Sequence, residues 1–464
     1  MTRDKVEVIS PNAVPKELLD KHTKNAPRYT SYPTAPQFSE NFDQERIKSE
    51  WKKTNRTEKR DISLYLHIPF CRTRCRYCGC FTETGHTQDF AAEYAGALLR
   101  EADFIHSLIS PERKIEQFAL GGGTPTFLSP NMLRTLIKGI YERFGFAETA
   151  ERSIEIDPRS VDENYLDILL ELGFNRFSFG VQDLDRRVQE AIGRIQDEGK
   201  IAALMNRLRK SGINAINLDI IHGLPEQTEK SFGETIDKVI NLKPSRIALF
   251  GYAHVPWVSP HQKALEQYRI PEPAEKIRLF GLAFDKLIDA GYCYVGMDHF
   301  ALPDDELIAA LTARTLTRNF MGYTTRRGLD LVALGASSIS SVGLTYTQNT
   351  KDISGYAGND EFPKWQKAFL MNDDDELRRE IIIDMFCNFY LDFGKVEKKF
   401  GVKFEERFER ELSELSEFEG DGLLRVGEKE ITVTPLGRFF IRNICMVFDA
   451  YIKRDPTKRY SKTF

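Results

Sequence analysis

The sequence lacks any long apolar run, and this absence excludes one large class of proteins. Hydrophobic residues make up 41% of the 464-residue chain and charged residues 29%, as in ordinary soluble globular proteins. No apolar stretch approaches the roughly 18–20 residues that a membrane span needs. The first ten residues also lack the basic-then-apolar pattern of a secretory signal. We therefore expect a cytoplasmic protein with no membrane span.

The sequence also lacks an excess of positive charge. Its net charge is −4, which argues against a surface that binds nucleic acid over the whole molecule.

The chain is too long for one ordinary core, so roughly two or three domains are expected. We expect no nucleic-acid partner and a monomeric chain.

Cysteines are few, odd in number and unevenly placed. Of the seven, four lie between Cys71 and Cys80, whereas Cys293, Cys387 and Cys445 stand alone. In a chain with no export signal, a tight group of cysteines indicates metal or redox chemistry rather than a disulfide framework. The three isolated cysteines are expected to be small buried hydrophobic residues.

Strands and helices alternate regularly after an irregular start. Residues 1–62 contain frequent prolines and are interpreted as an irregular arm with one short helix near Gln44–Lys53. Beyond them, short runs rich in β-branched and aromatic residues predict strands, each followed by a helical stretch. The predicted strands are Ser63–Ile68, Gln117–Leu120, Ser153–Ile156, Arg176–Phe179, Ala215–Ile220 and Arg246–Phe250, with a further candidate at Tyr292–Gly296.

This alternation favours an α/β fold with a parallel sheet and right-handed crossovers. Periodicity alone does not choose between an open barrel and a doubly wound sheet. Polar or glycine-rich residues follow the strands in turn: the cysteines, a triple glycine, then Glu155, Gln182 and Asp219. The carboxyl ends of parallel strands share one edge, where α/β proteins build their sites. We therefore predict the functional site at this edge.

From about Asp373 the sequence changes to charged helices. A hairpin at Gly422–Val426 and Ile431–Thr434, followed by a helix from Leu436, is typical of a winged-helix module. Residues 373–437 are acid-rich, and only the final helix and the tail are basic. A helical lid or cap is therefore favoured over a DNA-binding module.

The cysteine group has the spacing of an iron–sulfur site. Cys71, Cys75 and Cys78 are separated by three and two residues, so one short loop directs three thiolates to one [4Fe–4S] cluster. Three ligands leave one iron free to bind the amino and carboxylate groups of S-adenosylmethionine, whose reductive cleavage yields a 5′-deoxyadenosyl radical. A structural zinc site is disfavoured because such sites use two separated ligand pairs, and no second pair exists here. Interleaved arginines would offset the negative charge of the cluster.

The triple glycine is the second chemical signal. Gly121, Gly122 and Gly123 directly follow the second predicted strand and precede Thr124. Backbone N–H and C=O groups are accessible where no side chain covers them. We expect this segment to hold the polar amino-acid end of S-adenosylmethionine near the iron.

These motifs resemble the oxygen-independent coproporphyrinogen III oxidases of haem synthesis, which are radical S-adenosylmethionine enzymes. The resemblance covers roughly residues 25–464. Besides the cysteine and glycine segments, the matching segments are Pro27–Thr34, Tyr65–Cys71, Glu155–Arg159, Gly180–Asp183, Asp219–Pro225, Gly296–Phe300, Phe320–Thr325 and Arg442–Met446.

The resemblance implies a partial (β/α)6 radical-SAM barrel with an irregular N-terminal arm and a C-terminal helical, winged-helix-like domain. The expected domains are the arm at 1–62, the barrel at 63–300, a barrel extension and connecting segment at 301–372, and the helical domain at 373–464. It also implies two molecules of S-adenosylmethionine. The residues implied for the first, iron-bound molecule are Tyr65, Gly122, Glu155 and Ile339. Those implied for the second are Tyr77, Gly123, Thr124, Gln182, Arg194, Asp219 and Ala253.

The implied reaction converts two propionate side chains of coproporphyrinogen III to vinyl groups and gives protoporphyrinogen IX. Candidate catalytic residues are Tyr65, His67 and Cys80, with Cys80 expected not to ligate iron because a fourth ligand would close the open position. The tetracarboxylate substrate needs cationic partners, for which Arg28 and the basic C-terminal tail are candidates. An electron donor and an electron acceptor are also implied, and the sequence identifies neither.

Three alternatives stay open at this point. The first is a haem chaperone of the same superfamily, and the second is a radical enzyme that opens or methylates haem. The segment Tyr29–Thr34 and the residue Cys80 favour the oxidase, because the chaperone relatives typically lack them. The third is a winged-helix regulator with an iron–sulfur sensor, which leaves the strand-end motifs unexplained.

Overall fold

The computed structural model describes residues 8–57 and 60–452, which form two compact units. The sheet unit consists of Phe38–Pro271 and Gly328–Leu370. The helical unit consists of Met1–Gln37, Glu272–Arg327 and Met371–Phe464. Within the described residues, no helix combines the length and the apolar composition that a membrane crossing requires.

A twisted, mainly parallel sheet forms the centre of the sheet unit. Its strand order is β14-β13-β12-β11-β1-β2-β3-β4-β5-β6. The pairs from β11 through β1 to β6 are parallel, and β12, β13 and β14 continue the sheet in antiparallel fashion beyond β11. The strands are β1 (Ile62–Ile68), β2 (Ile115–Gly122), β3 (Phe146–Ile156), β4 (Arg176–Gln182), β5 (Ile216–His222), β6 (Arg246–Gly251), β11 (Asp330–Leu334), β12 (Ile339–Val342), β13 (Thr345–Asn349) and β14 (Trp365–Leu370).

The order of the parallel strands identifies the architecture. Strands β1 to β6 are neighbours in the order in which they occur in the chain. A doubly wound sheet reverses its strand order at a switch point, whereas a (β/α) barrel does not. The fold is therefore a partial barrel of six (β/α) units. Each of the six predicted strands overlaps an observed one, and their observed ends differ from the predicted ends mainly by extension.

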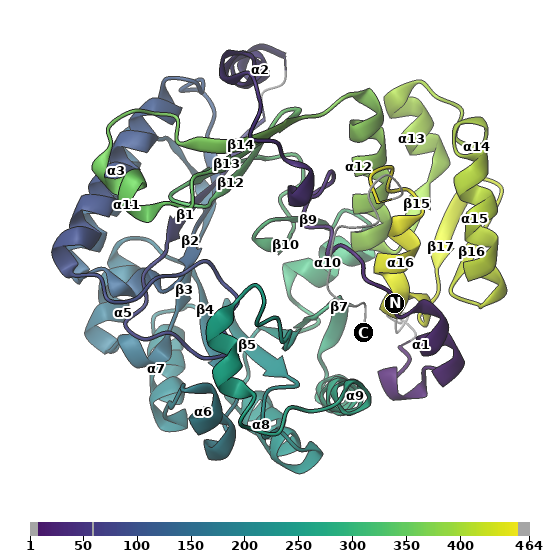
Figure 1. Cartoon of the computed structure of the whole chain (residues 1–464), viewed down its shortest axis with the longest axis horizontal. Coiled ribbons are helices and arrows are strands. Elements are labelled where there is room, and N and C mark those ends of the chain that lie inside the picture. Colours follow the sequence, from purple (N-terminus) through teal and green to yellow (C-terminus); the bar gives the residue numbers. More distant parts are fainter. Residues whose placement is uncertain (1–7, 58–59, 453–464) are drawn as a thin grey trace. The chain divides into compact units, whose positions relative to one another are not determined.

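Helices cover the outer side of this sheet (Figure 1), and α3, α4, α5 and α7 contact one another in that order. The helices of the unit are α2 (Gln44–Thr57), α3 (Gln88–His106), α4 (Pro130–Arg143), α5 (Glu163–Glu171), α6 (Arg186–Ile192), α7 (Glu198–Lys210), α8 (Glu229–Leu242) and α11 (Ile353–Gly358). Short polar side chains cap their N-termini: the side chains of Thr87, Ser129 and Asp162 each accept a hydrogen bond from a backbone N–H of the first turn.

Both faces of the first strand are covered, as expected for a parallel sheet inside an α/β protein. Leu64, Leu66 and Ile68 have no exposed surface, and Ser63 and His67 on the other face are also buried. Such a strand reads as a nearly continuous apolar run rather than as a strict alternation. This is why composition, and not periodicity, is the better sequence signal for β1.

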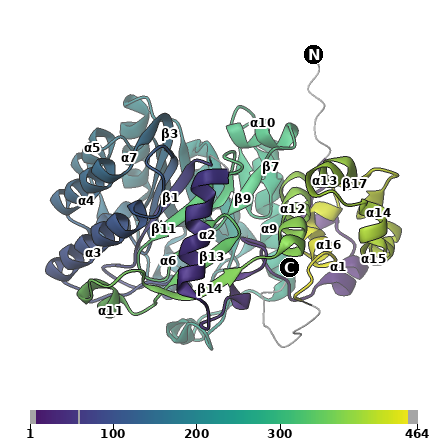
Figure 2. The ribbon, with the colours of Figure 1, turned by 90° about the horizontal axis from the view of Figure 1, so that it is seen from above.

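The antiparallel extension was not predicted as strands. Helix α2, which was predicted over a shorter range, packs against β13 (Figure 2), where the fully buried Trp51 donates a hydrogen bond from Nε1 to Thr345 Oγ1 at 3.1 Å. Residues 328–370 are far in sequence from the β1 to β6 series, and only pairing with β1 brings β11 into the sheet. Local sequence carries no signal for such a contact.

The helical unit has its own apolar core, built largely around α12 and a three-stranded sheet with the order β15-β17-β16. The predicted hairpin is present as β16 and β17, and the predicted final helix begins as a 3₁₀ turn at Gly437. The elements are α1 (Lys16–His22), α9 (Pro273–Asp289), β7 (Cys293–Gly296), β8 (His299–Ala301), α10 (Glu306–Thr312), β9 (Thr317–Asn319), β10 (Gly322–Thr324), α12 (Asp373–Asn388), β15 (Tyr390–Asp392), α13 (Phe393–Phe400), α14 (Phe404–Arg407), α15 (Glu409–Gly420), β16 (Leu424–Val426), β17 (Glu430–Val433) and α16 (Ile441–Met446).

Two details of the helical unit correct or extend the expectations. The arm contains a second helix, α1, which seven residues are too few to reveal by periodicity. Cys387 and Cys445 are buried as predicted, but Cys293 is only half-buried. The lysines and arginines of the basic tail, Lys453, Arg454, Lys458, Arg459 and Lys462, lie outside the described residues.

A buried carboxyl group connects α3 with the residue that follows β11, with the end of β13 and with α11. Glu101, which is 1% exposed, accepts hydrogen bonds from Gly335 N at 2.8 Å, from Asn349 Nδ2 at 2.6 Å and from the Tyr356 hydroxyl. Burial raises the pKa of Glu101 to about 7, and these hydrogen bonds oppose the shift. On the same helix, Tyr94 donates its hydroxyl to the His67 carbonyl at 3.0 Å.

The raised pKa predicts a specific pH dependence of stability. Between pH 4.5 and about 7 the folded chain keeps the Glu101 proton that the unfolded chain has lost, so its contribution to the free energy of unfolding falls as pH rises through this window. We expect the difference in unfolding free energy between wild type and Glu101→Gln to fall by about 3 kcal/mol over that range. Denaturant unfolding of the metal-free protein at several pH values measures it. Glu93→Gln, at an exposed position of the same helix, should follow the wild-type profile, and a Glu101→Gln profile parallel to wild type would contradict the prediction.

Candidate active site

The cysteine loop, residues Phe70–Glu83, follows β1 and is closed at its base by the backbone. Cys71 N donates to Glu83 O at 2.9 Å, and Glu83 N donates to Pro69 O at 2.7 Å. These bonds bring the two ends of the loop together. The four cysteines therefore lie in one short loop at the carboxyl end of β1.

Two later segments of the chain anchor the middle of the cysteine loop. Arg76 N donates to Ile192 O at 2.9 Å. Gln262 Nε2 donates to Tyr77 O at 2.8 Å, and His261 Nε2 lies 2.7 Å from Cys78 O. Since a carbonyl oxygen only accepts, His261 donates in this contact. The sequence analysis missed His261 and Gln262, and no local signal distinguishes them from other polar loop residues.

The thiols of the loop differ in exposure. Cys75 is buried, Cys71 and Cys78 are half-buried, and Cys80 is exposed. Within residues 8–57 and 60–452, no three His, Cys, Asp or Glu side chains converge closely enough to hold a single metal ion. A [4Fe–4S] cluster does not require such convergence, because each cysteine binds a different iron. Three thiols on one short loop are therefore a donor set that fits a [4Fe–4S] cluster.

Cys80 interacts directly with one of the predicted ligands. A hydrogen bond from the Cys80 thiol lowers the pKa of Cys78 to about 6, and the same bond raises the pKa of Cys80. The negative charge is therefore favoured on Cys78, while Cys80 keeps its proton.

Each residue of the triple glycine lies where a side chain would collide with a neighbour. A Cβ on Gly121 would lie 2.9 Å from the Glu155 carboxyl, and one on Gly123 would lie 2.8 Å from Phe70 O. At Gly122, which has φ +114°, a Cβ would lie 2.6 Å from the His67 ring. The segment therefore passes beside the end of β1 only because it has no side chains.

Glu155 lies near the end of β3 and Asp219 lies within β5, and β4 separates these two strands in the sheet. Glu155 accepts a hydrogen bond from Gly122 N at 3.1 Å, and desolvation, together with the negative charge of Asp219, raises the pKa of its carboxyl. Burial also raises the pKa of Asp219, to about 6, against hydrogen bonds from Asn217 at 2.8 Å and from Ser178 at 3.2 Å. Both carboxyl groups are thus acceptors that lack a direct cationic partner among the contacts described.

Tyr65 and His67 form a chain of hydrogen bonds on β1. His67 Nε2 lies 3.1 Å from Phe81 O, and His67 Nδ1 lies 3.0 Å from the Tyr65 hydroxyl. The carbonyl can only accept, so Nε2 carries the proton and Nδ1 accepts from Tyr65. Burial lowers the pKa of His67 to about 4. The imidazole is therefore neutral near pH 7 and orients the Tyr65 hydroxyl.

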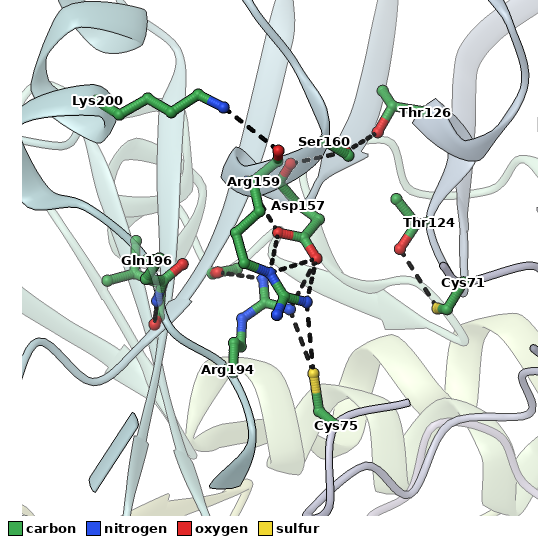
Figure 3. A network of polar contacts seen from close by, with 12 residues as sticks. Cys71, Cys75, Thr124, Thr126, Asp157, Arg159, Ser160, Arg194, Gln196 and Lys200 are labelled. Carbon is green, nitrogen blue, oxygen red and sulfur yellow. Dashed lines mark hydrogen bonds and ion pairs between the residues drawn. The ribbon is translucent and has the colours of Figure 1, made fainter. Parts of the chain in front are cut away.

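A group of charged side chains surrounds Cys75 (Figure 3). Arg194 Nη1 lies 3.5 Å from Cys75 Sγ and 3.0 Å from Asp157 Oδ2, and its Nη2 donates to Gly180 O at 2.6 Å. Arg159 approaches the same sulfur and the same carboxylate. On the other side of the figure, the Thr124 hydroxyl lies 3.4 Å from Cys71 Sγ. Asp157 and Arg159 were not among the predicted site residues, although the acid–proline–arginine turn after β3 was visible in the sequence.

The remaining predicted residues lie at the ends of the expected strands. Gln182 is the last residue of β4 and has φ +68°, and Ala253 is exposed two residues after β6. Ile339 begins β12, which is antiparallel to β11, while β11 is parallel to β1. The start of β12 therefore lies at the same edge as the carboxyl end of β1. Arg28, a candidate cationic partner of the substrate, forms an ion pair with Asp298 inside the helical unit.

Two protein families match this chain. Residues 65–239 match the Radical SAM superfamily, and residues 371–440 match the HemN C-terminal domain. The first match covers β1 to α8 of the sheet unit, including the cysteine loop, and the second begins just before α12 of the helical unit.

Individual proteins resemble the chain over nearly its whole length. It is 40% identical over 453 residues to the oxygen-independent coproporphyrinogen III oxidase of Pseudomonas aeruginosa, which covers 96% of this chain and 98% of that protein. It is 39% identical over 451 residues to the enzyme of that name from Helicobacter pylori, with 96% and 98% covered. The solved structure of the Escherichia coli coproporphyrinogen III oxidase HemN, described as a radical SAM enzyme, superposes with a TM-score of 0.87 at 40% identity, over 91% of this chain and 97% of that one. With these matches and the cysteine loop at the end of β1, the chain belongs to the family of oxygen-independent coproporphyrinogen III oxidases within the Radical SAM superfamily.

Proposed function

We propose that this chain oxidises coproporphyrinogen III without oxygen, converting two propionate side chains to vinyl groups and giving protoporphyrinogen IX. The observation that carries this function is the 40% identity to coproporphyrinogen III oxidases over 96% of the chain, which includes both units. In each conversion a propionate loses a hydrogen atom, carbon dioxide and one electron. An electron donor and an electron acceptor complete the reaction.

The cysteine loop fits a [4Fe–4S] cluster with three protein ligands, Cys71, Cys75 and Cys78. A bound cluster and S-adenosylmethionine supply the 5′-deoxyadenosyl radical that removes a hydrogen atom from the propionate β-carbon. The chain contributes the ligand thiols and an environment that stabilises their negative charge: Thr124 beside Cys71, Cys80 beside Cys78 and two guanidinium groups beside Cys75. Cys80 is exposed and protonated, so we assign it to substrate chemistry rather than to iron.

We assign the contacts to the first S-adenosylmethionine to Tyr65, Gly122, Glu155 and Ile339. The glycine segment leaves room for a ligand's polar end beside Glu155, whose carboxyl accepts hydrogen bonds suited to ribose hydroxyls or an ammonium group. His67 stays neutral, and its Nδ1 orients Tyr65 by accepting a hydrogen bond from the Tyr65 hydroxyl. We therefore assign His67 a positioning role and not a proton transfer. Its ring holds the Tyr65 hydroxyl on one side and, on the other, the carbonyl of Phe81, the residue after Cys80.

A second molecule of S-adenosylmethionine is a further part of the proposal. Its proposed contacts are Tyr77, Gly123, Thr124, Gln182, Arg194, Asp219 and Ala253. Arg194 supports it, because Nε of this buried side chain has no hydrogen-bond partner among the residues that the structure describes. An unsatisfied buried donor is costly, and a ligand carboxylate would satisfy it. The haem-transfer and haem-modifying alternatives are not favoured, because the near-full-length relatives carry the oxidase name.

Anaerobic turnover tests the function and the ligand assignment together. We expect the reconstituted protein to release two carbon dioxide molecules and two 5′-deoxyadenosine molecules per protoporphyrinogen IX, as two rounds require. Cys75→Ser should lose the cluster absorbance and fall below detection in the 5′-deoxyadenosine assay, because a serine hydroxyl is a poor cluster ligand. Cys293→Ser, at a half-buried cysteine outside the loop, should retain both. A wild-type protein that is loaded with cluster but never cleaves S-adenosylmethionine with this substrate would disprove the function.

Gly122 gives a second test, of the assigned cofactor contact. In Gly122→Ala the new Cβ would meet the His67 ring, and φ +114° is strained for any L side chain. We expect the dissociation constant for S-adenosylmethionine to rise roughly tenfold or more, which corresponds to about 1.4 kcal/mol. Equilibrium binding to the reconstituted protein measures it. Gly420→Ala, where a Cβ meets nothing within 4 Å, is the control, and wild-type affinity in Gly122→Ala would refute the assignment.

A further inference from the structure

The three predicted ligand thiols have unequal polar surroundings. Cys71 faces a neutral hydroxyl, that of Thr124, and Cys78 faces the Cys80 thiol. Cys75 faces two guanidinium groups: Arg194 Nη1 lies 3.5 Å from its sulfur, and Arg159 Nη2 lies 3.7 Å from it (Figure 3). Of the three sulfurs, the one of Cys75 is therefore the one that guanidinium groups approach within hydrogen-bonding distance among the contacts described.

Asp157 fixes the direction of both guanidinium groups. It accepts from Arg159 Nε at 3.0 Å, from Arg159 Nη2 at 2.7 Å and from Arg194 Nη1 at 3.0 Å. Burial alone would raise the pKa of Asp157, but the hydrogen bond from Arg159 and the charge of Arg194 outweigh it and lower the pKa. Asp157 is therefore ionised. The three groups together present a net charge of about +1 to Cys75, because one carboxylate offsets one of two guanidinium groups.

The backbone makes this arrangement rigid. Asp157 caps the turn Pro158–Ser160 by accepting a hydrogen bond from Arg159 N at 3.0 Å. This bond fixes the position of the Asp157 carboxylate relative to the backbone of Arg159. Arg159 O in turn accepts from Lys200 at 3.3 Å. The Arg159 side chain is 24% exposed. Its guanidinium nevertheless cannot rotate away from Cys75 without losing the hydrogen bonds that Nε and Nη2 donate to the Asp157 carboxylate.

We propose that Arg159, oriented by Asp157, donates an N–H to the sulfur of Cys75 when this sulfur ligates the cluster, and thereby raises the reduction potential of the cluster. Hydrogen bonds to ligand sulfurs and nearby positive charge stabilise the reduced, more negative form of an iron–sulfur cluster. Arg159 acts through Cys75, so it is a positioning residue. The proposal rests on the proposed function, because Cys75 must be a ligand.

The midpoint potential of the cluster tests this proposal without measuring turnover. The reconstituted full-length chain is titrated anaerobically with a chemical reductant and followed by absorbance and electron paramagnetic resonance. We expect Arg159→Gln to keep the wild-type iron and sulfide content but to be reduced with an equilibrium constant about tenfold lower, a shift of ~59 mV to more negative potential for a one-electron couple. Arg187→Gln removes an arginine that is 69% exposed and contacts Asp185 rather than a thiol, so it should titrate as wild type.

The lysine variant and the iron content separate the possible failures. Arg159→Lys keeps the charge but loses the planar fork, so we expect a smaller negative shift. If Arg159→Gln does not hold a cluster, the potential of Arg159→Lys tests the proposal instead. Wild-type potential in fully loaded Arg159→Lys overturns the proposal. Wild-type potential in fully loaded Arg159→Gln also overturns it while leaving the proposed function intact. A wild-type chain that binds no cluster overturns both.

Discussion

The parallel pairing of β1 with β2 is the constraint on which the rest of the site depends. In this register His67 lies opposite Gly121 and Ile68 opposite Gly122. The ladder continues past the strands, because Gly123 N donates to Ile68 O at 2.8 Å and Thr124 N donates to Phe70 O at 2.9 Å. This brings the Thr124 hydroxyl to Cys71 and requires three residues without side chains. A shift of one residue would drive a side chain of β2 into the start of the cysteine loop.

The same edge concentrates ionisable groups that the protein keeps in defined charge states. Asp157 is held ionised by two arginines, whereas burial favours the neutral forms of His67 and Asp219. The hydrogen bond between Cys80 and Cys78 raises the pKa of Cys80 and lowers the pKa of Cys78. We propose that the neutral polar groups bind and orient a cofactor, and that the fixed positive charge stabilises the thiolates of a cluster. Family membership rests on the comparisons, and the charge states at this edge suit the chemistry proposed for the site.

The α/β character, the six (β/α) units and the cysteine, glycine and carboxylate motifs could all be predicted from the sequence, because each depends on spacing or composition within a few residues. The order of the strands could not. Sequential neighbours identify a partial barrel rather than a doubly wound sheet, and this follows from pairing between segments tens of residues apart. Likewise β11 joins β1 across more than half of the chain, and the α1 helix is too short to be recognised locally.

The sequence by itself determined which residues can ligate a cluster, since the spacing of Cys71, Cys75 and Cys78 is a local property. Only the tertiary structure decided what surrounds each thiol. Arg159 and Arg194 reach Cys75 across sequence separations of 84 and 119 residues, and His261 reaches the carbonyl of Cys78 across 183. A hydrogen bond depends on distance and angle in space, and no periodicity along the chain records which distant side chain a fold brings within reach.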